Sequence, residues 1–356
     1  MRKVFVVCGA ILLAWCWGGV QAFGAVSPAL SQVIEGAKKE ERVAVILHST
    51  LYGKGVERLR RSIAEKYGVD LQIDYTPSGS YPITLAKIIT EQKTGAVPSN
   101  DLLVLADATL AKGVAAGIAE KVDWKPLLAE GTPPQAIQFD GKALSTHTNH
   151  FGLVYKPSVI SPQEAPKSFK DLANPKWRGK ILMYSYTSTY VGYSFILGVD
   201  KNLSTMRGIM KNEPVVDTYP RGLTRYMAGE YPILLTASTF FLEAKAKGVP
   251  AQWVSPEISL NTVHSVVVTK GARHPNAAKL VAVYLASPDG QKLMYEEVRA
   301  GNMFYPGNIE HDIDREDRRL GLKVYSIQQV PGLLDYLLSE KGAQTEREIG
   351  QILKGQ

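Results

Sequence analysis

Short apolar runs alternate with amphipathic stretches over most of this chain. Residues 43–47 and 102–106 are continuous apolar runs. Between them, residues 69–75 alternate apolar and polar side chains, and apolar residues at helical spacing mark 56–67 and 83–89. Short buried strands that alternate with amphipathic helices are typical of βαβ units. The pattern therefore predicts an α/β fold with a mainly parallel sheet flanked by helices.

The same plan begins again in the second half of the chain. Strand-like runs at 181–184, 215–216 and 233–237 are each followed by a helical pattern. Two extended stretches, 144–155 and 261–269, connect the halves. We therefore expect two lobes, each a mainly parallel sheet flanked by helices, joined by two hinge crossings of paired strands.

The boundaries follow from these crossings. We expect residues 26–145 and 262–290 to form the first lobe, and 146–261 to form the second. The remainder, residues 291–356, is expected to be a helical segment that packs on the lobes, with one last helix over 333–353. A chain of this length fits two ordinary domains.

The amino-terminal residues have the pattern of a secretory leader. A basic pair precedes an apolar run over residues 4–17, and residues 20–22 carry the small–x–small pattern that a signal peptidase reads. The run is too short to be a good membrane span. We expect a signal peptide over residues 1–22 and a periplasmic location. Both cysteines, Cys8 and Cys16, would leave with it, which excludes a cysteine enzyme and a thiolate metal site.

Charge and composition exclude two further classes. The formal net charge is +7, and two of these charges lie in the predicted leader. No Lys/Arg run with interleaved aromatic residues is present, so nucleic-acid binding is not expected. The hydrophobic fraction of 45% is that of a globular protein. After the leader there is no second long apolar run, so no membrane span is expected.

The candidate chemistry lies in the loops after the strands, because an open α/β sheet binds ligands beyond the carboxyl ends of its strands. These loops are rich in Ser, Thr and Tyr and poor in charge. Hydroxyl groups and helix amino-termini hold anions or polyhydroxy compounds well but transfer protons poorly near neutral pH. No G-x-S-x-G, H-E-x-x-H, Walker or G-x-G-x-x-G motif appears. We therefore expect a binding protein, not an enzyme, with no cofactor.

Arginine and histidine positions leave alternatives open. Arg221 suits a carboxylate or phosphoryl group, or it forms a surface pair with Asp217 or Glu230. His48 and His264 fall at predicted strand ends and so could reach a cleft. In the first crossing, the two-residue strand period places His147 and His150 on opposite faces. No histidine-based metal cluster can be built from sequence neighbours.

Several segments together resemble the periplasmic solute-binding proteins of ABC importers, in the branch that includes the ferric-ion-binding proteins. The resemblance covers about residues 30 to 306 and is carried by the order and spacing of six segments: 152–155, 165–172, 174–181, 228–233, 274–280 and 286–291. It implies a two-lobe clamp that closes on a solute and docks on a membrane permease.

The resemblance also implies a departure from iron binding. Ferric-binding relatives hold iron with an adjacent Tyr-Tyr pair, and the matching position here is Phe240-Phe241. Phenyl rings lack the phenolate oxygens that Fe(III) prefers. We expect one ring to pack in the core and the other to form an apolar wall. Iron held through Tyr184, Tyr186 or Tyr190 stays an alternative, as does a secreted hydrolase or transferase that pairs His48 or His264 with a serine.

We therefore expect a monomeric protein that binds a small organic, anionic solute and no metal. The expected contacts of the first lobe are His48, Ser49, Thr50, Ser78, Gly79, Ser80 and Asp107. Those of the second lobe are Thr187, Ser188, Tyr219, Arg221, Ser238, Thr239 and Phe240, with His264 near the second crossing.

Overall fold

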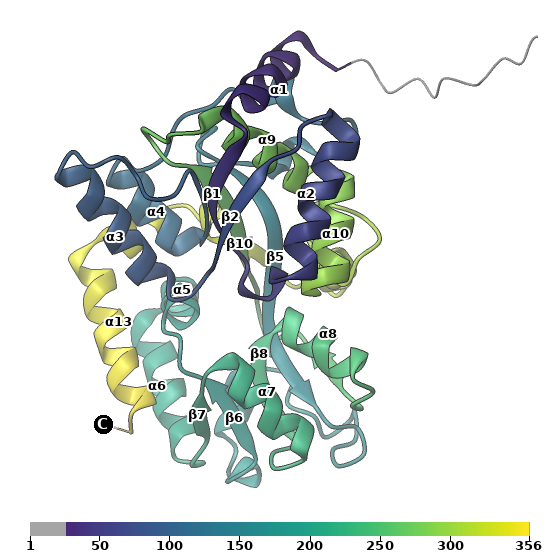
Figure 1. Cartoon of the computed structure of the whole chain (residues 1–356). Helices are drawn as coiled ribbons and strands as arrows, with labels where there is room; N and C mark the ends of the chain where they lie inside the picture. Colours follow the sequence, from purple (N-terminus) through teal and green to yellow (C-terminus); the bar gives the residue numbers. More distant parts are fainter. Residues whose placement is uncertain (1–25, 356) are drawn as a thin grey trace, which may run out of the picture.

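Residues 26–355 are described by the computed structural model, which places one α/β lobe above another (Figure 1). The predicted signal peptide, with Cys8 and Cys16, lies outside these residues. Within 26–355, the helices are too short or too polar to cross a bilayer.

Three parallel strands form the centre of the first lobe. In sheet order they are β2 (Gln72–Pro77), β1 (Arg42–Leu47) and β3 (Leu102–Ala106). Each is followed by a helix, because a parallel pair needs a crossover connection. After β1, β2 and β3 these helices are α2 (Lys54–Tyr67), α3 (Tyr81–Lys93) and α4 (Asp107–Ala115). The alternation predicted a strand over residues 69–75, but β2 begins only at Gln72, where its pairing with β1 starts. Val69 and Leu71 are nevertheless buried in the core.

The second lobe repeats this arrangement. Its parallel strands, in sheet order, are β8 (Ile233–Ala237), β6 (Ile181–Tyr184) and β7 (Val215–Asp217). The helices of this lobe are α5 (Ser188–Leu197), α6 (Val199–Met210), α7 (Tyr219–Ala228) and α8 (Ser238–Ala246). The α/β fold expected from the alternation of strands and helices is therefore confirmed.

Two long strands run between the lobes. They are β5 (Ala143–Tyr155) and β10 (Ser259–Val268). The first half of β5 pairs with β10, antiparallel, from Leu144 to His150, and its second half pairs with β8 from Phe151 to Tyr155. Strand β10 also pairs with β3. Strand β5 thus belongs to the sheets of both lobes, whereas β10 pairs within the sheet of the first lobe and the chain reaches it from the second lobe. Both predicted crossings are therefore present.

Each lobe has its own apolar core. In the first lobe, α1 (Pro28–Glu40) packs against α9 (Pro275–Ala286), whose side chains are buried from Ala277 to Ala286 apart from Lys279. The core of the second lobe is rich in aromatic rings, with Phe151, Tyr190 and Tyr193 in contact. Separate cores allow the lobes to move as units about the strands that join them.

The carboxyl-terminal segment differs from the expected helical appendage. It contributes a short strand, β11 (Val324–Ser326), that pairs with β10, and the last predicted helix is two helices separated at Ser339. The helices of this segment are α10 (Pro288–Val298), α11 (Ile309–Arg319), α12 (Leu333–Leu338) and α13 (Glu340–Leu353). The break has a local cause, since the Ser339 hydroxyl accepts a hydrogen bond from the Gly342 N–H and caps α13.

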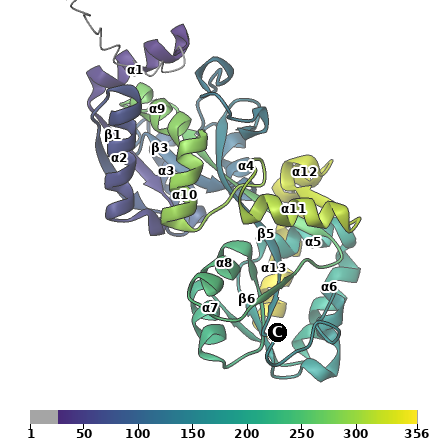
Figure 2. The same ribbon diagram turned by 90° about the vertical axis from the view of Figure 1, so that its right-hand side faces the viewer.

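This segment also contacts both lobes beside the crossing strands. Figure 2 shows α11 next to β5, with α12 above α11. Helix α12 touches α4 of the first lobe and α5 of the second. Helix α13 packs against α5 and α6, and its Glu346 lies 3.8 Å from Lys112 of α4. The carboxyl-terminal segment therefore braces the region in which the lobes join.

Two short strands extend the sheets at the ends of β5. Strand β4 (Ile137–Gln138) pairs with the start of β5, and β9 (Gln252–Val254) pairs with its end. Gly152 makes room for β9, because a Cβ at this position would lie 2.4 Å from the Trp253 ring.

Candidate functional site

Three histidines meet where the lobes join. His48, directly after β1, lies 5.2 Å from His147 of β5, measured between ring centroids. His147 stacks on His264 of β10 at 4.2 Å, with the ring planes 11° apart. His264 lies within β10 and not at its end, so it reaches this cluster because β10 crosses between the lobes. The histidine cluster therefore combines a side chain from the carboxyl end of β1 with one side chain from each crossing strand.

Burial holds these three imidazoles neutral. Desolvation lowers the pKa of His48 to about 4 and that of His264 to about 3. Desolvation also lowers the pKa of His147 well below its usual value, with further lowering from His264 and His48. Near neutral pH the cluster therefore offers polar ring atoms without positive charge.

A chain of hydrogen bonds leads from this cluster into both lobes. The Tyr81 hydroxyl oxygen, at the start of α3, lies 3.2 Å from His264 Nδ1. His264 Nε2 lies 3.2 Å from Asn149 Nδ2, and the Asn149 carbonyl oxygen accepts from the Thr239 hydroxyl. Since Thr239 lies in the first turn of α8, four side chains connect the two lobes.

Aromatic rings form a stack at the carboxyl ends of the second lobe's strands. The Tyr219 ring lies 4.8 Å from Tyr184 and 5.0 Å from both Tyr186 and Phe240. Tyr186 is 48% exposed, so the stack reaches solvent. Burial raises the pKa of Tyr184 and Tyr219 well above the usual range, so both phenols stay protonated.

The Phe240-Phe241 pair divides as expected. Phe241 is buried in the core of the second lobe, with its ring 5.7 Å from Trp253. Phe240 is only partly buried and stacks on Tyr219. The position at which ferric-binding relatives carry a tyrosine pair therefore supplies an apolar ring here.

Helices that follow the sheet strands lack the usual amino-terminal side-chain caps. The N-cap residues of α2, α3, α5, α7 and α8 make no capping side-chain hydrogen bond. Four other helices are capped in this way, namely α1 by Ser27, α10 by Ser287, α11 by Asn308 and α13 by Ser339, whereas α6, α9 and α12 are not. Uncapped N–H groups and the helix dipole together favour a negative charge.

Several predicted site residues already have protein partners. Thr50 bonds to His48 Nδ1 through its hydroxyl at 3.0 Å and its N–H at 3.4 Å. Thr187 donates to Glu346 of α13 at 2.8 Å. Ser78, Gly79 and Ser80 form the loop between β2 and α3, and Ser49, Gly79, Ser80 and Ser188 are exposed.

Asp107 lies fully inside the protein. Its carboxylate accepts hydrogen bonds from the N–H groups of Ala108, at 2.9 Å, and Val263, at 3.3 Å. Desolvation raises the pKa of Asp107 to about 7, although these backbone bonds oppose the shift. The side chain ties the start of α4 to β10, and its carboxylate does not face solvent.

Ser238 belongs to a buried network on the other face of β5. Its hydroxyl donates to Glu310, whose Oε2 also lies 2.7 Å from His150 Nδ1 and accepts from the His150 N–H at 3.0 Å. The Asn261 amide lies 3.2 Å from His150 Nδ1. The side chains of Glu310 and His150 are both fully buried. His150 and His147 therefore occupy opposite faces of β5, as the strand period predicts.

Arg221 is the one candidate cation of the predicted site. Its side chain is 78% exposed, and Nε lies 3.4 Å from Asp217 Oδ1. This is the surface pair that the sequence left open as an alternative. An exposed pair of this kind contributes little to stability and leaves the guanidinium available to solvent.

The histidine cluster was also considered as part of a nucleophile–base pair or a metal site. Within residues 26–355, no hydrogen bond joins the rings of His48 or His264 to a serine. The same residues contain no group of three or more His, Cys, Asp or Glu side chains that could hold a metal ion. Although three imidazoles are adjacent, two of them stack face to face, so their nitrogens do not converge on one point.

Tyr81 and Asn149 are absent from the predicted contacts, and Tyr186 was considered only as a possible iron ligand. Tyr81 directly follows the predicted Ser78–Ser80 loop and precedes Pro82, a residue that favours the first turn of a helix. Its place in that first turn could have been predicted from this pattern. Asn149 gave no such signal, because its role depends on the register between β5 and β10.

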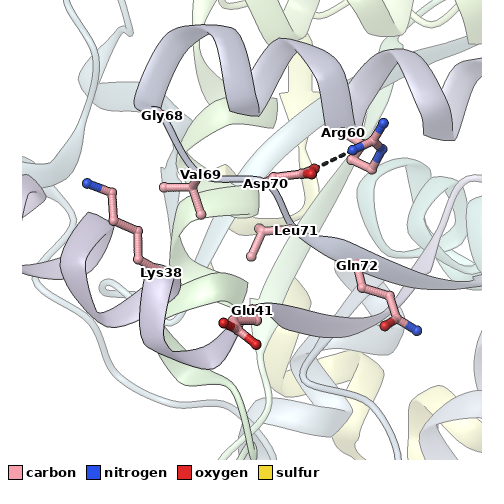
Figure 3. Close-up of a pocket in the computed structure, with 8 residues that line it drawn as sticks. All are labelled: Lys38, Glu41, Arg60, Gly68, Val69, Asp70, Leu71 and Gln72. Carbon is pink, nitrogen blue, oxygen red and sulfur yellow. Dashed lines mark hydrogen bonds and ion pairs between the residues drawn. The ribbon is translucent and has the colours of Figure 1, made fainter.

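A surface groove of about 490 Å³ lies at the opposite end of the first lobe. Lys38, Glu41, Arg60 and residues 68–72 border it (Figure 3). It adjoins the amino end of β2, away from the loops that follow the strands. An exposed ion pair joins Arg60 to Asp70 beside it (Figure 3).

The match to a family decides the class of protein. The model of the family described as bacterial extracellular solute-binding protein matches residues 49–296, which include both crossing strands and every predicted contact except His48. The chain belongs to this family. No curated protein sequence matches it. Since the family consists of substrate-binding proteins, this solute-binding protein is not an enzyme.

Solved structures of the same fold share little sequence with this solute-binding protein. Iron-bound HitA from Pseudomonas aeruginosa is 17% identical, with a TM-score of 0.66 over 87% of this chain and 99% of that one. The substrate-binding protein of an ABC transporter from Agrobacterium tumefaciens is 16% identical, with a TM-score of 0.69 over 89% and 97%. A periplasmic thiamin-binding protein is 13% identical, with a TM-score of 0.65 over 88% and 96%. These structures confirm the two-lobe fold.

Proposed function

We propose that this protein is the periplasmic substrate-binding component of an ABC importer. It captures a small organic anion with a flat apolar part between its lobes and delivers it to a membrane permease. The substrate-binding protein from Agrobacterium tumefaciens, which shares the fold, supports the transporter assignment. The protein acts as a monomer, and its signal peptide is removed on export.

The observation that carries the choice of solute is the combination of an aromatic stack with uncapped helix amino-termini. Tyr219, Tyr186 and Phe240 offer flat apolar surface, which suits a ring or a short hydrocarbon. The free N–H groups at the starts of α5 and α7 suit a carboxylate or a phosphoryl group. Arg221, at the start of α7, adds a positive charge that attracts an anionic solute over a long range.

A solute that contacts both lobes favours the closed form. A solute shifts the equilibrium between open and closed forms only by its difference in affinity for the two. Contacts from the loop after β2 in the first lobe and from α7 and α8 in the second would exist together only in the closed form. Hinge movement about β5 and β10 therefore couples binding to the shape that a permease recognises.

A thermal-shift screen tests the proposed solute class. The panel contains phenylphosphonate, benzoate, citrate, glycerol 3-phosphate, benzylamine, thiamin and Fe(III) citrate. A ligand at one hundred times its Kd stabilises the folded form by about 2.7 kcal/mol, which raises Tm by several degrees. We expect the rise from an aromatic anion and not from benzylamine, its cationic counterpart.

Two results of this screen would contradict the proposal. A rise in Tm from Fe(III) alone, with a visible phenolate-to-iron absorption band, would assign the protein to iron transport. A rise from thiamin or benzylamine without one from any anion would reverse the sign of the solute charge. As a matched variant, Tyr219→Leu removes the centre of the aromatic stack and is expected to weaken binding of the aromatic anion roughly tenfold.

A further inference from the structure

The hydrogen-bond chain between the lobes has a direction. At one end, the Thr239 hydroxyl meets the carbonyl oxygen of Asn149, which can only accept. At its other end, the Asn149 amide places its NH2 group 3.2 Å from His264 Nε2. An NH2 group can only donate, so Nε2 of His264 is the acceptor.

The tautomer of His264 follows from this contact. A neutral imidazole carries one N–H, and Nε2 is used as an acceptor, so the proton lies on Nδ1. The neutral form is the one expected, because desolvation lowers the pKa of His264 to about 3. Nδ1–H then donates to the Tyr81 oxygen, which lies 3.2 Å away. The Tyr81 oxygen acts as the acceptor at the end of the chain.

The consequence falls on the Tyr81 hydroxyl proton. Since the oxygen accepts from His264, its own O–H can donate to another group, and a solute acceptor would compete for it with the Ser78 side chain, its hydrogen-bond partner in the preceding loop. Tyr81 begins α3 directly after the Ser78–Ser80 loop, and Tyr186 of the second lobe is near enough to affect its pKa. Burial raises the pKa of Tyr81 to about 12, so the phenol keeps its proton near neutral pH. The group offered between the lobes is therefore a neutral donor.

We propose that the chain Thr239–Asn149–His264 orients Tyr81 as a hydrogen-bond donor that selects solutes carrying an acceptor, such as a carboxylate or phosphonate oxygen. This inference rests on the proposed function for the solute, but the direction of the chain is a property of the protein alone. Asn149 and Thr239 act as positioning residues, and Tyr81 contacts the solute. A solute group that only donates, such as an ammonium, finds no partner there.

The direction is tested by NMR on the solute-free protein. Long-range ¹H–¹⁵N correlation spectra distinguish the two tautomers, and a His264→Gln variant assigns the ring. We expect the Nδ1–H tautomer in the wild type. The Asn149→Leu variant keeps similar volume without a donor, so we expect the ring to lose this preference and populate Nε2–H. An Nε2–H ring in the wild type, or a tautomer unchanged in Asn149→Leu, would overturn the inference.

The selective role of Tyr81 is tested by binding of phenylphosphonate. Tyr81→Phe is expected to weaken this binding roughly tenfold, the usual effect of removing one hydrogen bond to a charged group. Tyr52→Phe is the matched control, since Tyr52 is a 76% exposed tyrosine of the same lobe, and we expect no change. Equal affinity in wild type and Tyr81→Phe would overturn the role.

Failure of the proposed function gives a different result. If no member of the solute panel binds while His264 has the Nδ1–H tautomer, the proposed function fails and the direction of the chain stands. If an anion binds while the ring has the Nε2–H tautomer, the direction fails and the proposed function stands.

Discussion

Lowering the pH from 7.5 to 5 is expected to destabilise this protein strongly through its three clustered histidines. In the unfolded chain these rings gain a proton near pH 6.5, whereas burial lowers the pKa of His48 to about 4 and that of His264 to about 3. The unfolded state therefore binds more protons than the folded state below pH 6.5. The stabilising contribution is complete above that pH and is lost as pH falls toward the folded pKa values.

The size of this effect follows from the pH interval. One pH unit corresponds to about 1.4 kcal/mol for each ring, so at pH 5 the loss is on the order of 2 kcal/mol for each. His147, whose pKa is lowered as well, adds a contribution of the same sign. Asp107 opposes the three rings, because its pKa is raised to about 7 and its folded state therefore binds more protons than the unfolded state over this interval. One carboxyl offsets only part of the loss from three rings.

Urea unfolding between pH 7.5 and 5 measures this loss, and NMR titration of the ring Cε1–H signals identifies its source. We expect the signals of the three rings to stay constant from pH 8 to 5, and the pH dependence of stability to be smaller in His48→Asn. Ring signals that titrate near pH 6.5 would contradict the prediction.

Replacing Glu310 by alanine is expected to lower the free energy of unfolding by about 3–5 kcal/mol. Its buried carboxylate accepts from the His150 N–H, the His150 ring and the Ser238 hydroxyl, and none of these groups can reach water. Removal leaves the His150 ring and the Ser238 hydroxyl proton without this acceptor, whereas the His150 N–H keeps the Ser238 oxygen at 3.0 Å. Each buried donor left unpaired costs about 1–3 kcal/mol. The substitution also detaches α11 from the crossing strand β5 and from the start of α8.

Glu316→Ala is the matched control for this prediction. Glu316 lies on the same helix, but its side chain is 51% exposed and pairs with Arg319 at the surface. We expect a change within about 0.5 kcal/mol for this variant, because exposed pairs contribute little. Urea unfolding of both variants at pH 7.5 measures the difference. Similar losses of unfolding free energy in the two variants would contradict the prediction, because the buried network would then contribute no more than an exposed pair.

The fold was predictable because its signals are local. Apolar runs such as Val43–Leu47 and Leu102–Ala106 are long enough to identify buried strands, and the helical stripes between them require crossovers. The crossing strands were visible for the same reason, since β5 is an unbroken extended stretch of thirteen residues. The burial of Phe241 but not Phe240 agrees with the helical period of α8.

The site was less predictable because its contacts are distant in sequence. Asp107 and Ser238 stand directly after strands, as binding residues would, yet Asp107 accepts bonds from β10 and Ser238 donates to α11. Those partners lie 156 and 72 residues farther along the chain. Thr187 is likewise engaged by Glu346 of α13. A sequence pattern identifies the loop that carries a side chain. It does not identify the distant residue to which that side chain is already hydrogen-bonded.

The central claim is that a solute is held between two lobes that close around it. Spin labels at Lys87→Cys of α3 and Thr224→Cys of α7 report on this movement, since these exposed positions lie on helices of opposite lobes. The sequence has no cysteine besides Cys8 and Cys16 of the predicted leader, so labelling of the exported protein is specific. Pulsed electron–electron resonance then measures the distance with and without the panel member that raises Tm most. With the solute bound, we expect a shorter and narrower distribution of distances between the two spin labels. An unchanged distribution at saturating solute would contradict it.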